Sequence, residues 1–520
     1  AMPAVQIYDT TLRDGTQSEG FSLSGHSKIR LAQRLDDLGV AFIEGGWPGS
    51  NPEDAEFFER ARDIEWQRAL ITAFGSTCRV KGGPDEDANI RALLDARTEV
   101  CTIFGKTWTL HVTDVLLTTL DDNLRIIEQS VAYLRAAGRR VIYDAEHFFD
   151  GYRADPLYAV ATLQAAIRGG AETVVLCDTN GGSMPWEVEN TIRELKDSIR
   201  HPFGIHTHND GDCAVINALT AVRLGAVQVQ GTINGVGERC GNANLCSVMA
   251  NLELKMGRRC LPEGRLQKLY ELSHVVDEVA NITPNDHLPY VGRSAFAHKG
   301  GVHVAAMRRS EQSYQHVAPE RVGNRMRVVV SALSGRANIL SKAEEHGVDV
   351  GSVDDVVGVL NDVKELEARG FSFEAAEASV AMMLKRQQPD YAAPFALVDF
   401  LVNVEHRQGR GIFAEAMVKV KVHGEVLHTA AEGNGPVNAL DIALRKALMG
   451  HYPEIASFHL ADYKVRILDG RDGTQAITRV LIDTRSADKV WSTVGASANI
   501  IEASWQALVD AVEYGLSVAQ

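Results

Sequence analysis

Two histidines one residue apart, His206 and His208, are the side chains of this sequence best placed for metal chemistry. On an extended strand, residues i and i+2 project from the same face, so both imidazoles could bind one ion. Two structural histidines would look the same, but Asp14 adds a carboxylate after the first strand-like run and Asn242 an amide oxygen after the eighth. Nitrogen and oxygen ligands that leave open positions suit a catalytic Mg, Mn, Zn or Co ion. The sequence therefore predicts a divalent metal site at these four residues.

Charged side chains near the predicted ligands could act on a carbonyl group. Arg13 precedes Asp14, and a guanidinium beside a metal ion can stabilise an oxyanion, although a structural ion pair is the alternative. Asp144 and Glu146 would share one face of a strand and point into one cavity, where two carboxylates need a partner. A salt bridge to Arg13 or to another buried base is the structural interpretation of Glu146, and it is compatible with a catalytic role.

Alternating strand-like and helix-like segments must position these residues. Eight short apolar runs are each followed by an amphipathic stretch of the kind seen at residues 27–38 and 123–137. The number and length of these units predict an α/β fold with a (β/α)8 TIM barrel, and an open, doubly wound sheet is the alternative. The barrel is favoured because the polar residues follow the strand ends, where barrel enzymes build their active sites. The eight runs are residues 5–9, 41–45, 71–75, 100–105, 141–147, 173–178, 203–209 and 226–233.

The chain of 520 residues is long enough for more than one hydrophobic core, and its pattern changes twice after the barrel. We expect a catalytic barrel at residues 1–280, a helical linking subdomain at 281–390 and an α+β C-terminal domain at 391–520. In the last domain the pattern predicts strands at residues 416–422, 463–468 and 478–483, and helices at 436–447 and from residue 500.

Composition argues against several classes of function. The formal net charge is −15, with 68 acidic against 53 basic side chains, so neither nucleic acid nor a membrane surface is an expected partner. No apolar run approaches the roughly 20 residues of a transmembrane helix, and no signal peptide is expected before the first strand. The seven cysteines form no Cys-x-x-Cys pair and are interpreted as reduced thiols. A cytoplasmic protein is predicted.

Several longer motifs are similar to those of one enzyme family. They are residues 9–17 (Asp-Thr-Thr-Leu-Arg-Asp-Gly-Thr-Gln), 45–52 (Gly-Gly-Trp-Pro-Gly-Ser-Asn-Pro), 206–209, 231–244 and 295–303. In this order they resemble the 2-isopropylmalate, homocitrate and citramalate synthase family over essentially the whole chain. Residues 45–52 and 298–303 look most similar to its bacterial citramalate synthase branch. The resemblance implies a metal-dependent acyltransferase that condenses acetyl-CoA with a 2-oxo acid.

The resemblance implies the same metal ligands and assigns roles to further residues. The 2-oxo acid would bind the metal, and Thr179 would form a hydrogen bond with its carboxylate. Arg13 would polarise the keto group, while Glu146 would position the acetyl methyl group and act as, or hold, the base. Gln17 and Asp144 would complete the substrate site.

Two residues of the linking subdomain, His303 and Tyr314, match family positions that reach the active site of the partner subunit. This implies a homodimer with shared active sites, in which His303 competes with Glu146 for the role of base. Without the resemblance, both would be interpreted as ordinary polar residues of a helix and a loop.

The substrate and the effector are inferred from the same resemblance. Phe74 and Phe104 could close the pocket against the isopropyl group of 2-oxoisovalerate, and Asp144 would repel the second carboxylate of 2-oxoglutarate. Pyruvate is therefore the expected substrate. The C-terminal domain resembles the family's allosteric domain at residues 431–439 and 495–505, which implies a branched-chain amino acid as effector, isoleucine if the product is citramalate.

Three other functions stay open at this point. The chain could be a 2-isopropylmalate synthase, a metal-dependent lyase that cleaves a carbon–carbon bond on the same barrel, or an amino-acid-binding regulator with an inactive barrel. Residues 471–475 repeat the Arg-Asp-Gly-Thr-Gln of residues 13–17. No His-x-His accompanies the repeat, so we interpret it as a turn.

Overall fold

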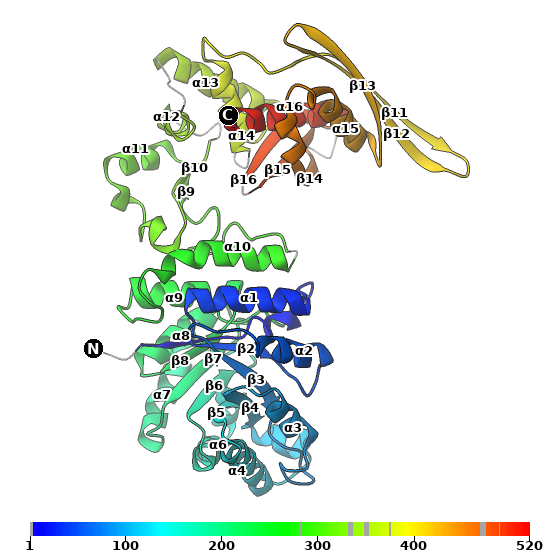
Figure 1. Ribbon diagram of the computed structural model, residues 1–520. Helices are drawn as coiled ribbons and strands as arrows, with labels where there is room; N and C mark the ends of the chain where they lie inside the picture. The colour runs from blue at the N-terminus through cyan, green and yellow to red at the C-terminus, as the bar shows by residue number, and fades with distance from the viewer. Residues whose placement is uncertain are drawn as a thin grey trace. The chain divides into compact units, whose positions relative to one another are not determined.

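The computed structural model describes residues 4–280, 282–330, 336–347, 353–373, 376–468, 475–487 and 489–519. The chain forms two compact units, Ala1–Phe296 with Val317–Arg325, and Ala297–His316 with Met326–Gln520. Figure 1 labels most of the helices and strands of both. The domain boundaries expected near residues 280 and 390 stay a prediction.

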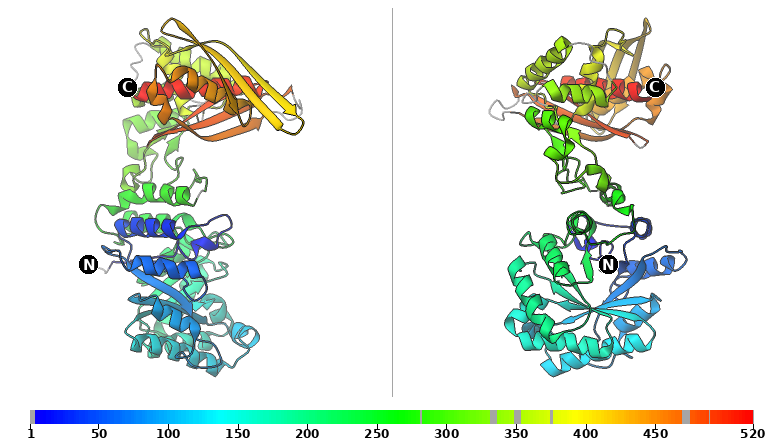
Figure 2. Two further views of the ribbon diagram at one scale, coloured as in Figure 1. Left: turned by 45° about the vertical axis from the view of Figure 1, so that its right-hand side comes forward. Right: turned by 90° about the vertical axis from the view of Figure 1, so that its left-hand side faces the viewer.

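The first unit is a closed barrel of eight parallel strands, as the sequence predicts. The right-hand view in Figure 2 shows these strands at the centre of the unit, with helices around them. Tyr8 of the first strand pairs with Gln230 of the last, which closes the sheet and excludes the open, doubly wound alternative. The strands are β1 (Gln6–Asp9), β2 (Phe42–Gly46), β3 (Leu70–Ser76), β4 (Val100–Lys106), β5 (Arg140–Glu146), β6 (Thr173–Asp178), β7 (Phe203–Thr207) and β8 (Gln228–Gly231).

The first helix of this unit begins and ends at residues that satisfy free backbone groups. α1 (Gly25–Leu38) begins where the Ser24 hydroxyl accepts a hydrogen bond from the Ser27 amide at 3.2 Å. It ends at Gly39, whose φ of 98° is a left-handed conformation that favours glycine. The other α-helices are α2 (Pro52–Ala61), α3 (Ala88–Asp95), α4 (Leu120–Ala136), α5 (Phe148–Ala154), α6 (Pro156–Gly169), α7 (Pro185–Ser198), α8 (Ala214–Arg223), α9 (Leu245–Leu254) and α10 (Leu269–Val279).

Apolar side chains fill the barrel and also the space between its strands and helices. The large outer cluster includes Ile7 and Ile43. Successive residues of a strand face opposite sides, so Tyr8 points into the barrel while Ile7 and Asp9 point towards the helices. The inner cluster consists of Tyr8, Phe42, Val100, Ile142, Val175 and Cys177.

The carboxyl of Asp9, at the end of β1, makes stability depend on pH. Burial raises its pKa to about 7, although its two oxygens accept hydrogen bonds from the Thr11 amide and hydroxyl, both at 2.9 Å. A carboxyl whose pKa is raised stabilises the folded state fully below its unfolded pKa, and this contribution is lost as the pH rises through about 7. The free energy of unfolding of Asp9→Asn, which cannot ionise, should therefore rise relative to that of the parent protein by about 1 kcal/mol between about pH 6 and about pH 8.

Urea unfolding at the two pH values measures this difference. Asp37→Asn is the control, because ion pairs lower the pKa of Asp37 and this carboxyl stays ionised over the whole interval. A constant difference between Asp9→Asn and the parent protein would contradict the prediction.

The second unit combines helices with two antiparallel sheets of three strands. The first sheet consists of β11 (Ala396–Arg407), β12 (Gly411–Val422) and β13 (Glu425–Gly433), and α15 (Pro436–Leu448) packs on β12 and β13. The second consists of β14 (His459–Ile467), β15 (Thr478–Ser486) and β16 (Lys489–Ser497), and α16 (Ile500–Ala519) packs on β15 and β16. The preceding region carries α11 (Gly301–Arg309), α12 (Arg336–Glu345), α13 (Val353–Ala368), α14 (Glu377–Arg386) and the short strands β9 (Ala297–His298) and β10 (Arg327–Val328).

The predicted strands and helices of this unit are confirmed in β12, β14, β15, α15 and α16. Among the described strands of the two three-stranded sheets, β11, β13 and β16 were not predicted, and neither were the short strands β9 and β10. β11 exposes most of its side chains, and its sequence shows no alternation of apolar and polar residues. β13 and β16 are rich in small residues, which carry a weak strand signal. Most of the repeat at residues 471–475 lies outside the described residues.

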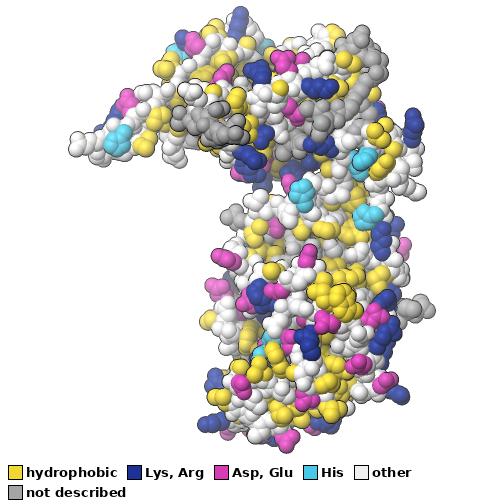
Figure 3. All heavy atoms as spheres, turned by 180° about the vertical axis from the view of Figure 1, so that it is seen from behind, with side chains coloured by type: hydrophobic (Ala, Val, Ile, Leu, Met, Phe, Trp, Pro, Cys, Tyr) yellow, Lys and Arg dark blue, Asp and Glu magenta, His cyan; other side chains and the backbone are white. Residues whose placement is uncertain are grey.

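No helix in the described part of the chain is both long and apolar enough to cross a membrane. On the face of the molecule shown in Figure 3, acidic and basic side chains are interspersed among the described residues. The charge on that face is therefore mixed.

Candidate active site

A cavity of about 230 Å³ opens at the carboxyl ends of the barrel strands, where barrel enzymes build their active sites. Of the site residues predicted in the first unit, all but Asn242 line it. The lining residues are Arg13, Asp14, Gln17, Trp47, Phe74, Phe104, Asp144, Glu146, Cys177, Thr179, His206, His208, Glu238 and Arg239.

Four atoms that could bind a metal ion converge in this region. Oδ2 of Asp14 lies 3.2 Å from Nε2 of His206 and 4.0 Å from Nε2 of His208. The two imidazole nitrogens are 3.2 Å apart, and the amide oxygen of Asn242 is 3.0 Å from Nε2 of His206. All four side chains are buried. A carboxylate, two imidazoles and an amide oxygen this close together fit a divalent cation between them.

Backbone pairing brings these ligands together from distant parts of the chain. His206 lies on β7 opposite Gln230 of β8, and His208 forms an isolated β-bridge with Asn242. The Asp14 amide donates to the Thr10 carbonyl at 2.8 Å, in the turn that follows β1. The Thr10 hydroxyl donates in turn to the carbonyl of Gly231, at the end of β8. Closure of the barrel between β1 and β8 therefore places Asp14 beside the two histidines.

Neighbouring charges shift the pKa values within this group. Burial raises the pKa of Asp14, but the Arg13 guanidinium and the hydrogen bond from His206 hold it well below its usual range. Burial lowers the pKa of His206, yet the hydrogen bond and charge of Asp14 outweigh this and raise it to about 9. Burial and the nearby His206 lower the pKa of His208 to about 4. The group is thus an Asp14–His206 ion pair beside a neutral His208, and a cation bound by His206 would displace its proton.

Arg239 contacts the outer nitrogen of His208. Its guanidinium donates to the Thr179 carbonyl at 2.7 Å and to Nδ1 of His208 at 3.1 Å, and it pairs with Asp210 at 2.8 Å. A guanidinium only donates, so Nδ1 of His208 accepts and the neutral ring carries its proton on Nε2. A cation bound through Nε2 would therefore require Arg239 to release Nδ1. Arg239 was not among the predicted site residues, and its only signal was its place in the motif of residues 231–244.

Arg13 is held between a buried carboxylate and an aromatic ring. Its Nε donates to Glu44, which is fully buried and also accepts from the Tyr8 hydroxyl. Its guanidinium lies 3.8 Å from the centre of the Phe74 ring and 3.7 Å from Oδ2 of Asp14. The structural ion pair that was the alternative for Arg13 is present, with Glu44 as partner. Because Arg13 also lines the cavity, this ion pair orients the guanidinium and does not remove it from the site.

The two carboxylates of β5 have different partners. Glu146 accepts from Nζ of Lys106 at 2.6 Å, so its basic partner is Lys106 and not Arg13. Asp144 accepts from Nε2 of Gln230 at 3.0 Å, and burial together with the charge of Glu44 raises its pKa to about 7. The Glu146 side chain is 23% exposed, whereas Asp144 is buried. Glu146 is therefore the more accessible of the two to a substrate.

Thr179 and Gln17 contribute the uncharged polar groups that were predicted. The Thr179 hydroxyl accepts from the His147 amide at 2.8 Å, so its own proton can be donated to a ligand. Gln17 ends the short 3₁₀ helix Gly15–Gln17, which follows directly after Asp14. Both side chains line the cavity.

Three aromatic side chains form one wall of the cavity. Phe74 and Phe104 stack with their centroids 5.5 Å apart, and Trp47 meets each of them edge-on, also at 5.5 Å. The indole N–H of Trp47 donates to Asn89 at 2.8 Å, which fixes the ring. Phe74 and Phe104 lie where the sequence predicted a wall. Trp47 had no assigned role, although it belongs to the motif of residues 45–52.

His303 and Tyr314 belong to the second unit. His303 lies on α11, and its ring stacks on that of Tyr314 with a centroid distance of 4.4 Å. Tyr314 is 46% exposed. Their contribution to the active site of a partner subunit stays a prediction.

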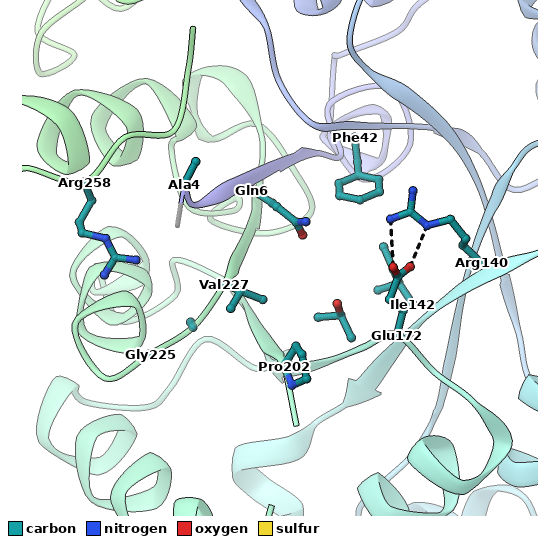
Figure 4. Close-up of a pocket in the computed structure, with 12 residues that line it drawn as sticks. Ala4, Gln6, Phe42, Arg140, Ile142, Glu172, Pro202, Gly225, Val227 and Arg258 are labelled. Atoms are coloured by element: carbon teal, nitrogen blue, oxygen red, sulfur yellow. Dashed lines mark hydrogen bonds and ion pairs between the residues drawn. The ribbon is translucent and has the colours of Figure 1, made fainter. Parts of the chain in front are cut away.

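A larger cavity, of about 480 Å³, opens at the opposite end of the barrel (Figure 4). Its Arg140 pairs with Glu172 at 2.8 Å and with Glu99 at 3.3 Å, so these charges already satisfy one another. Much of the remaining wall is apolar, with Phe42 and Val227 as examples. Side chains at this end of a TIM barrel serve mainly stability. The cavity at the carboxyl ends is therefore the candidate active site.

Family profiles match most of the chain. The HMGL-like family matches residues 4–276, the homocitrate synthase post-HMGL domain-like family residues 290–370, and the LeuA allosteric (dimerisation) domain residues 374–516.

Curated proteins match over almost the full length. The chain is 53% identical to the (R)-citramalate synthase of Geobacter sulfurreducens, over 99% of this chain and 98% of that protein. It is 50% identical to the (R)-citramalate synthase of Synechocystis sp., over 98% and 96%. It is also 30% identical to the 2-isopropylmalate synthase of Methanocaldococcus jannaschii, over 98% and 94%.

Proposed function

Because the chain belongs to the family of the (R)-citramalate and 2-isopropylmalate synthases, we propose that it is an acyltransferase that condenses acetyl-CoA with pyruvate to give citramalate and CoA. The observation that carries the proposal is the placement of Arg13 beside Asp14, His206 and His208 in one small cavity. Pyruvate is favoured over 2-oxoisovalerate because the citramalate synthases are 53% and 50% identical to the chain and the 2-isopropylmalate synthase is 30% identical.

Asp14, His206 and His208 hold one divalent cation in this proposal, with Asn242 as a further ligand. When bound, such a cation acts as a Lewis acid on the keto group and orients the 2-oxo acid. The mixed nitrogen and oxygen donor set is compatible with Mg, Mn, Zn and Co.

The chain's own residues bind the 2-oxo acid and move the proton. Arg13, oriented by Glu44, donates to the keto oxygen as it becomes negative, and Thr179 donates to the carboxylate. Glu146 removes a proton from the acetyl methyl group, or holds the base that does so. The resulting enolate carbon forms a bond with the keto carbon, and water then hydrolyses the thioester and releases CoA. Gln17 and Asp144 complete the substrate site.

The second unit has two roles in the proposal. Its C-terminal part matches the LeuA allosteric (dimerisation) domain, which supports a homodimer and regulation by a small effector. We propose isoleucine as that effector, because it is the branched-chain amino acid expected to regulate a citramalate synthase. His303 and Tyr314 reach the partner's active site. The enzyme is expected to work in the cytoplasm.

Release of free CoA tests this function. The full chain is mixed with acetyl-CoA and Mg²⁺ or Mn²⁺, and thiol release is measured with pyruvate, 2-oxobutyrate, 2-oxoisovalerate and 2-oxoglutarate. The highest kcat/KM is expected with pyruvate. The highest value with 2-oxoisovalerate would identify a 2-isopropylmalate synthase instead. Absence of release with all four acids would contradict the condensation and favour a lyase.

The aromatic wall predicts how the substrate preference can be changed. Phe104→Ala removes the ring that stacks on Phe74 and should make room for a longer tail. The ratio of kcat/KM for pyruvate to that for 2-oxoisovalerate should fall about 10- to 100-fold, as expected when a few carbon atoms of a hydrophobic pocket are removed. Trp186→Ala, which truncates an exposed aromatic residue outside the cavity, is the control and should leave the ratio unchanged. An unchanged ratio in Phe104→Ala would remove the wall from the specificity pocket.

A further inference from the structure

His206 belongs to two groups of buried side chains that could each hold a metal ion. The first group contains Asp14 and His208, and the second contains Asp144 and Cys177. In each group the potential ligand atoms lie within 4.8 Å of one another. The first offers only oxygen and nitrogen, whereas the second includes a thiol sulfur. The His206 imidazole is common to both groups, so an ion bound by His206 occupies either the first group or the second. A side chain that contacts His206 can determine which group binds the ion.

The fully buried side chain of Gln230 lies between two members of the second group, His206 and Asp144. Its Oε1 is 2.8 Å from Nδ1 of His206, and its Nε2 donates to Oδ1 of Asp144 at 3.0 Å. The NH₂ end of the amide faces two oxygens, because Nε2 also donates to Oε1 of Gln228 at 3.3 Å. The other end of the amide therefore presents its carbonyl oxygen to His206.

This orientation determines where the imidazole of His206 carries its proton. A carbonyl oxygen only accepts, so Nδ1 of His206 must be the N–H donor. In the neutral ring the free electron pair is then on Nε2. That atom lies 3.2 Å from Asp14 and 3.0 Å from the Asn242 oxygen, inside the first group.

We propose that Gln230 is a positioning residue that directs the divalent ion to Asp14, His206 and His208 and away from Asp144 and Cys177. It does so by keeping Nδ1 of His206 protonated and by engaging Asp144 in a hydrogen bond. Cys177 is then left with a weak contact to the Val175 carbonyl at 3.7 Å. The inference rests on the proposed metal site and adds the residue that selects it.

A cobalt titration tests the inference without measuring catalysis. The full chain is treated with a chelator and titrated with Co²⁺, because a thiolate ligand adds a charge-transfer absorption band that nitrogen and oxygen ligands do not give. The parent protein should bind one Co²⁺ without this band. In Gln230→Leu the dissociation constant should rise about 10- to 100-fold, as is typical when the hydrogen-bond partner of a metal-binding histidine is lost. The thiolate band should appear, and it should be absent from a Gln230→Leu/Cys177→Ser double variant.

Two further variants keep the result interpretable. Gln228→Leu, on the same face of β8, removes an amide that bonds to Gln6 and Gln230 but not to His206, and it should bind Co²⁺ like the parent protein. Gln230→Met also removes the acceptor but keeps the length of the side chain, and it replaces Gln230→Leu if that variant does not fold.

The possible results separate this inference from the proposed function. Parent-like affinity and spectrum in a folded Gln230 variant would overturn it, and weaker binding without the thiolate band would overturn the selection between the two groups. A parent protein that binds no Co²⁺ would instead refute the proposed metal site itself.

Discussion

Asp14→Asn is expected to lower kcat/KM for CoA release by on the order of 10³-fold or more. The substitution preserves the shape of the side chain but removes the carboxylate charge that lies 3.2 Å from His206 and 3.7 Å from Arg13. In the proposed site this carboxylate is the anionic ligand of the cation, and it also holds its two cationic neighbours in place. The thiol-release assay with pyruvate, at several Mg²⁺ or Mn²⁺ concentrations, measures the effect.

Asp37→Asn is the matched control for this prediction. Asp37 has the same side chain and pairs with Arg265 at 2.9 Å and with Lys268, but it does not line the cavity. Its substitution should leave kcat/KM close to the parent value. If Asp14→Asn kept more than about a tenth of the parent activity at saturating metal, Asp14 would not be an essential ligand.

Substitution of Arg13 should have the second largest effect. Arg13→Gln should lower kcat by about 10²- to 10³-fold with a smaller change in KM, because the guanidinium acts on charge that develops in the transition state. Arg13→Lys should recover only part of this loss. A lysine ammonium keeps the charge, but it lacks the planar group that now bonds to Glu44 and lies over Phe74.

Steady-state kinetics with pyruvate as the varied substrate distinguish a fall in kcat from a rise in KM. Arg34→Gln serves as the control, since Arg34 is exposed and pairs with Glu271 at 3.0 Å on the outside of the barrel. A rise in KM at unchanged kcat in Arg13→Gln would mean that the guanidinium binds substrate and transition state equally.

The strands and the two histidines of the cavity could be predicted because both depend on local patterns. The spacing of His206 and His208 places two side chains on one face of a strand whatever surrounds it. Asp14 could be added because a barrel brings the ends of its strands to one surface. The eight strands were recognisable because buried strands of a parallel sheet are short, continuous apolar runs.

The pairing of side chains across the cavity could not be predicted, because it depends on contacts between strands that are far apart in sequence. Lys106 of β4, rather than Arg13, is the partner of Glu146, because neighbouring strands place the two opposite each other. Gln230 reaches Asp144 across the inside of the barrel, 86 residues away. A glutamine within a strand carries no pattern that distinguishes this role from that of a surface residue. The strand β11 escaped prediction for a different reason, since most of its side chains are exposed on both faces.

The pairing of β1 with β8 also has a consequence for the order of folding. The contact between Thr10 and Gly231 joins residues 221 positions apart. Asp14 meets His206, which also contacts Asn242, only once this contact exists. The loop between Thr10 and Gly231 closes late in folding. The conformational entropy that is lost when so long a loop closes must be offset by contacts among the strands between these two residues. During synthesis, a chain that has emerged from the ribosome only as far as β7 cannot assemble the cation site. Capture of a cation therefore follows completion of the barrel, and it stabilises the finished unit over partly folded forms.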